Sequence, residues 1–333
     1  MEVNRQLWMT LGESSAIGAL RREAEAYGMA RGLNASLAER LRLVVSEAGS
    51  NILTHAGRGH LAVVPSFSGA SLSVLAIDKG PGIGDLAKSS RDGFSSRANS
   101  AGLGLGSLRR LADDFEIFST PQQGTVLRCR LDLSEPRPAR LQVEGLNRPC
   151  RHETVSGDQM RIRWHRGDWW LLLADGLGHG QKAHDASMAA AEVFESEPFE
   201  SPQECIERIH VALRSTRGAA AGVARVSEDP ARVQFCGVGN VEAYFLGFRG
   251  RASSLVSKNG TLGHAIRALE TVEVDWPPGS ALIMNSDGIS TRANLQGLRN
   301  VAAASLLVVA GVLMRDFGKA HDDCSVLVAR RTP

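Results

Sequence analysis

Three polar side chains with helical spacing mark the first place where this chain could do chemistry. Glu47, Asn51 and His55 recur every fourth residue within an apolar periodicity that predicts a helix over 37–56. An amide oxygen such as that of Asn51 can bind Mg²⁺, and a carboxylate one turn away can orient or deprotonate a nucleophile. A solvated polar face has the same spacing, so the triplet alone leaves both interpretations open.

A glycine-rich segment after the next apolar strand favours a flat ligand. Asp78 ends that strand, and the glycines that alternate after it are Gly80, Gly82 and Gly84. Backbone without side chains can approach a ring closely, while the carboxylate accepts a hydrogen bond from an exocyclic amine. A glycine-rich turn is the alternative interpretation.

A second glycine-rich segment comprises Gly102, Gly104 and Gly106 and leads directly into a predicted helix over 103–113. The free N–H groups at a helix N-terminus bind phosphate, and glycines before it allow a close approach. The chain has 35 glycines, so this pattern is weak by itself. It is not a dinucleotide fingerprint, because no strand immediately precedes it.

The later half of the chain places aspartates at the ends of predicted strands. Asp175 and Asp287 each follow an apolar run and precede a glycine, whereas Asp322 precedes an apolar run; Asp158 comes earlier, after Gly157. Carboxylates that converge from distant strands can hold two divalent ions, and an all-oxygen set favours Mg²⁺ or Mn²⁺. For any one of them, an ordinary turn aspartate is the alternative.

The elements that must position these residues differ between the two halves. In the first half we predict mixed α/β structure, with helices over 14–31, 37–56 and 103–113 and strands over 61–64, 72–77, 115–119 and 125–131. In the second half strands predominate and helices interrupt them near 182–195, 202–214 and 302–317. This order suggests a β-sandwich flanked by helices and an α+β chain overall.

The length of 333 residues favours two domains, and the prolines at 136 and 138 interrupt regular structure between them. We expect a first domain over 1–134, a linker over 135–149 and a second domain over 150–333. The net charge of +2, with both signs mixed, gives no case for nucleic acid or a membrane surface. No signal peptide is visible, and five scattered cysteines fit a reduced cytoplasmic location.

The motifs of the first half resemble the GHKL ATPase superfamily over about residues 10–132. Residues 47–51 resemble its N box, 78–84 its G1 box and 102–106 its G2 box. The short segment between the glycine boxes looks like that of the anti-sigma serine kinases of the RsbT and RsbW type. The resemblance implies an α/β sandwich in which helices cover a mixed sheet, with ATP and Mg²⁺ as cofactors.

The same resemblance implies roles for single residues. Glu47 would be the general base toward a protein serine, Asn51 the Mg²⁺ ligand and Asp78 the adenine reader. Thr125, which follows Gly124, would assist adenine binding, and the glycines of the two boxes would contact the nucleotide. Many family members have an aromatic residue where this chain has His55.

The aspartates of the second half resemble those of the PPM metal-dependent protein phosphatases, in their SpoIIE and RsbX class, over about residues 150–331. The most specific element is Asp-Gly-Leu-Gly-His-Gly at 175–180. The resemblance implies that Asp175 bridges two metal ions and that the Gly176 carbonyl and Asp158 serve one of them. Asp287 and Asp322 would serve the other ion.

The resemblance also bears on two neighbouring residues, Asp323 and His179. Asp322 is chosen over Asp323 because the family's ligand comes first in that element. The resemblance does not decide whether His179 is structural or supports a metal ligand.

Both resemblances together imply a partner-switching regulator. It would dephosphorylate phosphoserine or phosphothreonine on a STAS-domain anti-sigma antagonist, and would use ATP to phosphorylate such a protein. A sigma or anti-sigma factor is a further expected partner. One alternative is a phosphatase whose N-terminal domain only binds ATP or a partner; a second is an anti-sigma-like interaction protein.

Overall fold

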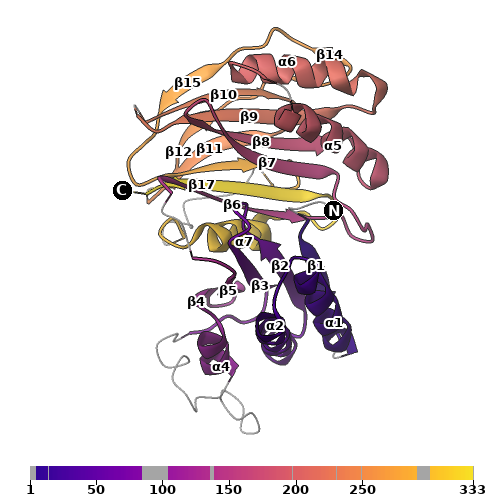
Figure 1. The fold of residues 1–333 in the computed structure, drawn as a ribbon, viewed down its shortest axis with the longest axis vertical. Helices are drawn as coiled ribbons and strands as arrows, with labels where there is room; N and C mark the ends of the chain where they lie inside the picture. Colours follow the sequence, from indigo (N-terminus) through magenta and orange to yellow (C-terminus); the bar gives the residue numbers. More distant parts are fainter. Residues whose placement is uncertain are drawn as a thin grey trace. The chain divides into compact units, whose positions relative to one another are not determined.

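The computed structural model describes residues 5–13, 15–84, 104–135, 139–196, 198–229, 231–248, 250–290 and 301–332 (Figure 1). The chain divides into two compact units, Met1–Pro138 and Ala139–Pro333. Across the described ranges, no helix has both the length and the apolar character needed to cross a membrane.

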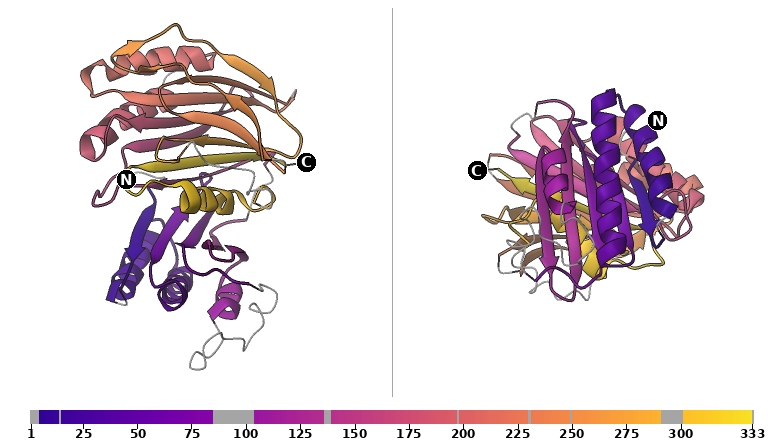
Figure 2. Two further views of the ribbon diagram at one scale, coloured as in Figure 1. Left: turned by 180° about the vertical axis from the view of Figure 1, so that it is seen from behind. Right: turned by 90° about the horizontal axis from the view of Figure 1, so that it is seen from below.

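The first unit is a five-stranded sheet with helices packed on one face (Figure 2). Its strands, in spatial order, are β1 (Leu7–Leu11), β2 (Gly59–Pro65), β3 (Ser71–Asp78), β5 (Gly124–Asp132) and β4 (Asp114–Thr120). Its helices are α1 (Ser15–Met29), α2 (Ala35–His55) and α4 (Gly104–Leu111).

The expected α+β class is confirmed, but the sheet of the first unit is antiparallel at every pair of described strands, where a mixed sheet was expected. Short connections join β2 to β3 and β4 to β5. Such hairpins force neighbouring strands to run in opposite directions, which the resemblance to a superfamily could not specify for this chain.

Helix α2 supplies much of the core of the first unit. Asn34 caps its N-terminus, because its side chain accepts a hydrogen bond of 2.9 Å from the Leu37 N–H. An apolar stripe with helical period is buried against the sheet; its members are Leu41, Val44, Val45, Ala48 and Ile52. Glu47 and Asn51 lie beside this stripe and are half-buried.

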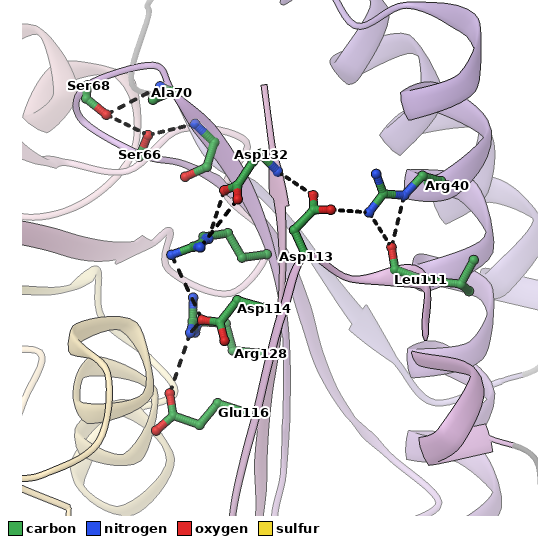
Figure 3. A network of polar contacts seen from close by, with 12 residues as sticks. Arg40, Ser66, Ser68, Ala70, Leu111, Asp113, Asp114, Glu116, Arg128 and Asp132 are labelled. Atoms are coloured by element: carbon green, nitrogen blue, oxygen red, sulfur yellow. Dashed lines mark hydrogen bonds and ion pairs between the residues drawn. The ribbon is translucent and has the colours of Figure 1, made fainter. Parts of the chain in front are cut away.

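A polar network fixes the end of α4 against α2 (Figure 3). Arg40 on α2 donates to the Leu111 carbonyl and, at 2.8 Å, to Asp113. The second carboxylate oxygen of Asp113 accepts from the Asp132 N–H at 2.8 Å. The arginine thereby satisfies a carbonyl at the helix C-terminus and holds α4 beside the polar face of α2.

The second unit is a β-sandwich flanked by helices, as predicted. One sheet has the order β15-β10-β9-β8-β7; these strands are Val272–Asp275, Arg232–Val238, Ala219–Ser227, Asp168–Gly176 and Asp158–His165. The other has the order β12-β11-β16-β17-β6; these are Gly250–Leu255, Glu242–Gly247, Ala281–Asn285, Cys324–Arg331 and Leu141–Arg148.

Helices cover the outer faces of this sandwich. α5 (Gln181–Ser196) and α6 (Pro202–Ala212) pack on the first sheet, and α7 (Leu306–Phe317) packs on β17 and β6 of the second. A 3₁₀ turn, η1 (Leu213–Ser215), follows α6, and two short strands, β13 (Gly260–Thr261) and β14 (Ala265–Ile266), form a small ladder.

Strand β6 lies within the segment that we expected to link the two domains. It pairs with β17 along its whole length, from Leu141 opposite Arg331 to Arg148 opposite Cys324. Its side chains do not alternate cleanly between buried and exposed, so the residues themselves carry little strand signal. The pairing with a strand more than 170 residues later defines it.

Candidate functional site

Two of the predicted metal ligands lie side by side on neighbouring strands. Asp158 is the first residue of β7 and stands directly opposite Asp175, which is next to the last residue of β8. Directly opposed residues point to the same face with Cβ atoms about 5 Å apart. The Asp158 carboxylate is buried beside the hydroxyls of Ser286 and Ser325, and a cation would balance its negative charge.

The other two predicted ligands meet at an end of the second sheet. Asp287 follows β16 and Asp322 precedes β17, and these strands are antiparallel neighbours. The two carboxylates lie close enough for Asp287 to raise the pKa of Asp322. The backbones also touch: a Cβ added to Gly288 would lie 1.9 Å from the Asp323 carbonyl oxygen. Glycine is therefore required for this approach.

The crowded carboxylates change one another's acidity. Burial, followed by the negative charges of Asp158 and Asp287, raises the pKa of Asp175 to about 10. Burial is the main cause for Asp158 too, and its pKa rises to about 7. Burial and the neighbouring Asp287 raise the pKa of Asp322. Carboxylates from both sheets thus share one electrostatic environment, and the raised pKa values of Asp158, Asp175 and Asp322 favour bound protons until cations replace them.

The donor set fits hard divalent ions. All predicted ligands are oxygens, as Mg²⁺ and Mn²⁺ prefer. Gly176 brings its backbone close to α5, because an added Cβ would lie 2.0 Å from the Ala183 carbonyl oxygen. Within the described ranges no three His, Cys, Asp or Glu side chains meet in the geometry of a bound ion.

Asp323 has a different role from its neighbour Asp322. It is buried, and its Oδ1 accepts from the Cys150 N–H at 2.7 Å while its Oδ2 accepts from the Gly157 N–H at 2.9 Å. Both oxygens are therefore engaged with the loop that precedes Asp158. This geometry favours Asp322 as the ligand and Asp323 as the residue that positions the loop.

Two further polar residues lie at this site and were not found by sequence reasoning. Asn240, after β10, donates its side-chain amide to the Oδ2 of Asp287. Glu153 pairs with His179, with 2.8 Å between Oε1 and Nδ1. The only sequence signal for Asn240 is its place after a glycine at a strand end, and Glu153 has none.

The nucleotide-site residues of the first unit gather around α2. Gly104 begins α4 and faces Asn51: a Cβ added there would lie 2.9 Å from the Asn51 Oδ1. The Asn51 Nδ2 is buried and lacks a hydrogen-bond partner in the described part of the unit. Gly106 lies in the first turn of α4, whereas Gly102 lies outside the described residues.

The predicted adenine-binding residues meet across β3 and β5. Asp78 stands opposite Thr125 in the sheet, and its Oδ1 accepts from the Gly80 N–H at 2.8 Å. The Thr125 hydroxyl lies 2.9 Å from that of Ser119.

Close backbone contacts explain why two positions of this region must be glycine. A Cβ on Gly82 would lie 2.3 Å from the Thr120 carbonyl oxygen, and Gly82 has a φ of 70°. A Cβ on Gly124 would lie 2.0 Å from the Asp78 carbonyl oxygen. Gly84 has no atom within 4 Å of an added Cβ, so its position is open.

Comparisons with known families match both units. A model described as "Histidine kinase-like ATPase domain" matches residues 12–131. A model described as "Stage II sporulation protein E (SpoIIE)" matches residues 165–332, which is about half of the chain.

Two characterised proteins of Bacillus subtilis (strain 168) are similar to the two halves. The phosphoserine phosphatase RsbX is 25% identical over 138 residues, which cover 41% of this chain and 69% of that protein. The serine/threonine-protein kinase RsbT is 35% identical over 92 residues, which cover 27% of this chain and 68% of that protein.

Solved structures match the phosphatase-like fold. One, described as "The bacterial stressosome: a modular system that has been adapted to control secondary messenger signaling", superposes with a TM-score of 0.53 and 27% identity over 58% of this chain and all of that one. RsbX in complex with magnesium has a TM-score of 0.53 and 21% identity over 59% of this chain and 98% of that one, which shows a shared fold.

Proposed function

The chain belongs to the SpoIIE phosphatase family in its C-terminal half and to the histidine kinase-like ATPases in its N-terminal half, and from this premise we propose a regulator with two opposed activities. It is a partner-switching type of serine/threonine phosphatase fused to a kinase-like ATPase domain. Its phosphatase unit removes phosphate from a serine or threonine of a STAS-domain anti-sigma antagonist. Its ATPase unit returns phosphate to such a protein.

One observation carries the phosphatase proposal: Asp158 and Asp175 from one sheet share their electrostatic environment with Asp287 and Asp322 from the other. These residues, with the Gly176 carbonyl, would hold two Mg²⁺ or Mn²⁺ ions. When bound, the ions would supply an activated water and neutralise charge on the phosphoryl group. The chain itself orients the carboxylates, through Asn240 at Asp287 and through the loop held by Asp323.

The phosphatase test is hydrolysis of p-nitrophenyl phosphate and of a phosphorylated STAS protein with Mn²⁺. Asp175→Asn should reduce the rate at least a hundredfold, because it removes the predicted bridging ligand. Asp275→Asn is the matched control: this exposed carboxylate on β15 pairs with Arg232, and its loss should leave the rate unchanged. Full activity of Asp175→Asn would refute the metal assignment.

The kinase proposal is supported by the placement of Glu47 and Asn51 one turn apart on α2, with Asn51 against the first residue of α4. Phosphoryl transfer depends mainly on positioning and charge neutralisation, so a base, a Mg²⁺ ligand and a helix N-terminus form a sufficient set. Asp78 and Thr125 would bind adenine.

The kinase test follows transfer of labelled γ-phosphate from Mg²⁺-ATP to a STAS protein. Glu47→Gln should abolish transfer and keep ATP affinity, whereas Glu39→Gln on the exposed side of the same helix should change neither. ATP binding without any transfer by the wild-type chain would favour a phosphatase whose N-terminal unit only binds nucleotide.

A further inference from the structure

We propose that Lys319 binds the phosphoryl group of the substrate, as the cation that anchors a phosphomonoester dianion beside the metal ions. The inference rests on the phosphatase function of the C-terminal unit. It concerns a residue that follows α7 and stands three positions before the predicted ligand Asp322.

The backbone of Lys319 is fixed to the site while its side chain is not. Its N–H donates to the Gly288 carbonyl at 2.8 Å, and its own carbonyl accepts from the Arg148 guanidinium. The side chain is 47% exposed, and its Nζ lies 3.8 Å from the Oδ2 of Asp322. The ammonium is thus held at the rim of the carboxylate cluster but beyond hydrogen-bond reach of the ligand.

Lys319 differs from Asn240 in how it interacts with its aspartate at this site. Asn240 makes a direct hydrogen bond to Asp287 and so orients that carboxylate. Lys319 only attracts Asp322 through charge, because an ion pair of this length and exposure is weak. Orientation of the ligand therefore does not explain the position of the lysine.

Two arginines near the site are engaged with backbone oxygens. The Arg148 guanidinium donates to the Lys319 carbonyl, and the Arg217 Nη1 donates to the Leu177 carbonyl at 3.0 Å. The ammonium of Lys319 has three donors and can turn toward a ligand.

Charge balance identifies the phosphoryl group as the ligand of the Lys319 ammonium. Four ionised aspartates and two divalent ions sum to zero, so the loaded centre has no surplus positive charge for an incoming dianion. Once an ion takes the charge of Asp322, the nearby ammonium is left to attract the next anion, which is the phosphoryl group. A charge-assisted hydrogen bond to a phosphate oxygen that the ions do not contact would hold the substrate in line.

The test measures binding of inorganic phosphate to the Mn²⁺-loaded full-length chain by isothermal titration calorimetry, alongside hydrolysis of p-nitrophenyl phosphate. Lys319→Gln should weaken phosphate binding and raise KM about tenfold or more, because it removes one charge-assisted hydrogen bond. The Mn²⁺ affinity should stay within about twofold, and Lys319→Arg should restore most of the phosphate affinity. Lys258→Gln, which removes the same charge from an exposed pair with Glu270, is the matched control.

The outcomes separate this inference from the function on which it rests. Unchanged phosphate affinity in Lys319→Gln, with an active wild-type chain, would overturn the role of the lysine alone. A matching loss of Mn²⁺ affinity would also overturn it, because Lys319 would then organise the metal ligand. A wild-type chain without Mn²⁺-dependent hydrolysis would refute the phosphatase activity itself and this inference with it.

Discussion

Replacing Asp175 by asparagine should stabilise the metal-free chain while it destroys the metal site. The pKa of Asp175 is raised to about 10, first by burial and then by its acidic neighbours. A carboxyl in an unfolded chain has a pKa of about 3.9, so holding a proton on Asp175 at pH 7 costs up to about 4 kcal/mol. The side chain is half-buried and shares the effect with Asp158, so we expect about 2 kcal/mol.

The sign of the pH dependence follows from the raised pKa values. Below about pH 4 both the folded and the unfolded chain carry the proton, so the carboxylate cluster does not lower the free energy of unfolding. As the pH rises, the unfolded chain loses protons first. The free energy of unfolding of the metal-free wild-type chain therefore falls as the pH rises from about 4 through the pKa of Asp158, about 7, toward that of Asp175, about 10.

The assay is urea unfolding in EDTA at pH 5 and pH 8, followed by tryptophan fluorescence. Four of the five tryptophans belong to the second unit, at positions 164, 169, 170 and 276, so the signal reports mainly on this unit. The advantage of Asp175→Asn over wild type should be larger at pH 8 than at pH 5. In saturating Mn²⁺ the order should reverse, because only the wild-type chain gains binding free energy.

If metal-free Asp175→Asn and wild-type chains lose stability in parallel between pH 5 and pH 8, the carboxylates do not form one repulsive cluster. Asp275→Asn, which removes an exposed charge, should track wild type at both pH values.

Two other predictions test residues that position the sites. Asn240→Ala should weaken Mn²⁺ binding about tenfold in a calorimetric titration, because Asp287 loses the donor that orients it, and unchanged affinity would show that the hydrogen bond is dispensable. Gly104→Ala should lower ATP affinity at least tenfold in an equilibrium binding assay, because the added methyl would lie 2.9 Å from the Asn51 Oδ1 and displace it; ATP affinity equal to wild type would remove Asn51 from the site.

Local patterns predicted the helices and most strands because burial imposes a period on the residues. The stripe of α2 and the apolar runs that become β8 and β16 are of this kind. Strand β6 has no such alternation, and its pairing with β17 depends on residues far away in the sequence. The antiparallel order of the first sheet likewise depends on connections that periodicity does not encode.

The residues of the candidate site also fall into those that the local sequence identifies and those that it does not. The four aspartates could be named from their types and neighbours because each lies at a strand end, and the glycines because they recur at every second position in two segments. The donors that orient them could not: Cys150 lies 173 residues from Asp323, and Asn240 lies 47 residues from Asp287. Such partners are set by how two sheets pack, which no short stretch of sequence records.

The shared location of four aspartates at the ends of two sheets has a mechanical consequence. Asp158 and Asp175 belong to strands of one sheet, whereas Asp287 and Asp322 flank strands of the other. An ion held by members of both pairs would be a removable cross-link between the layers of the sandwich. The metal concentration would then set the resistance of the phosphatase unit to proteolysis as well as its catalytic rate. A chain deprived of metal would be inactive and rapidly degraded.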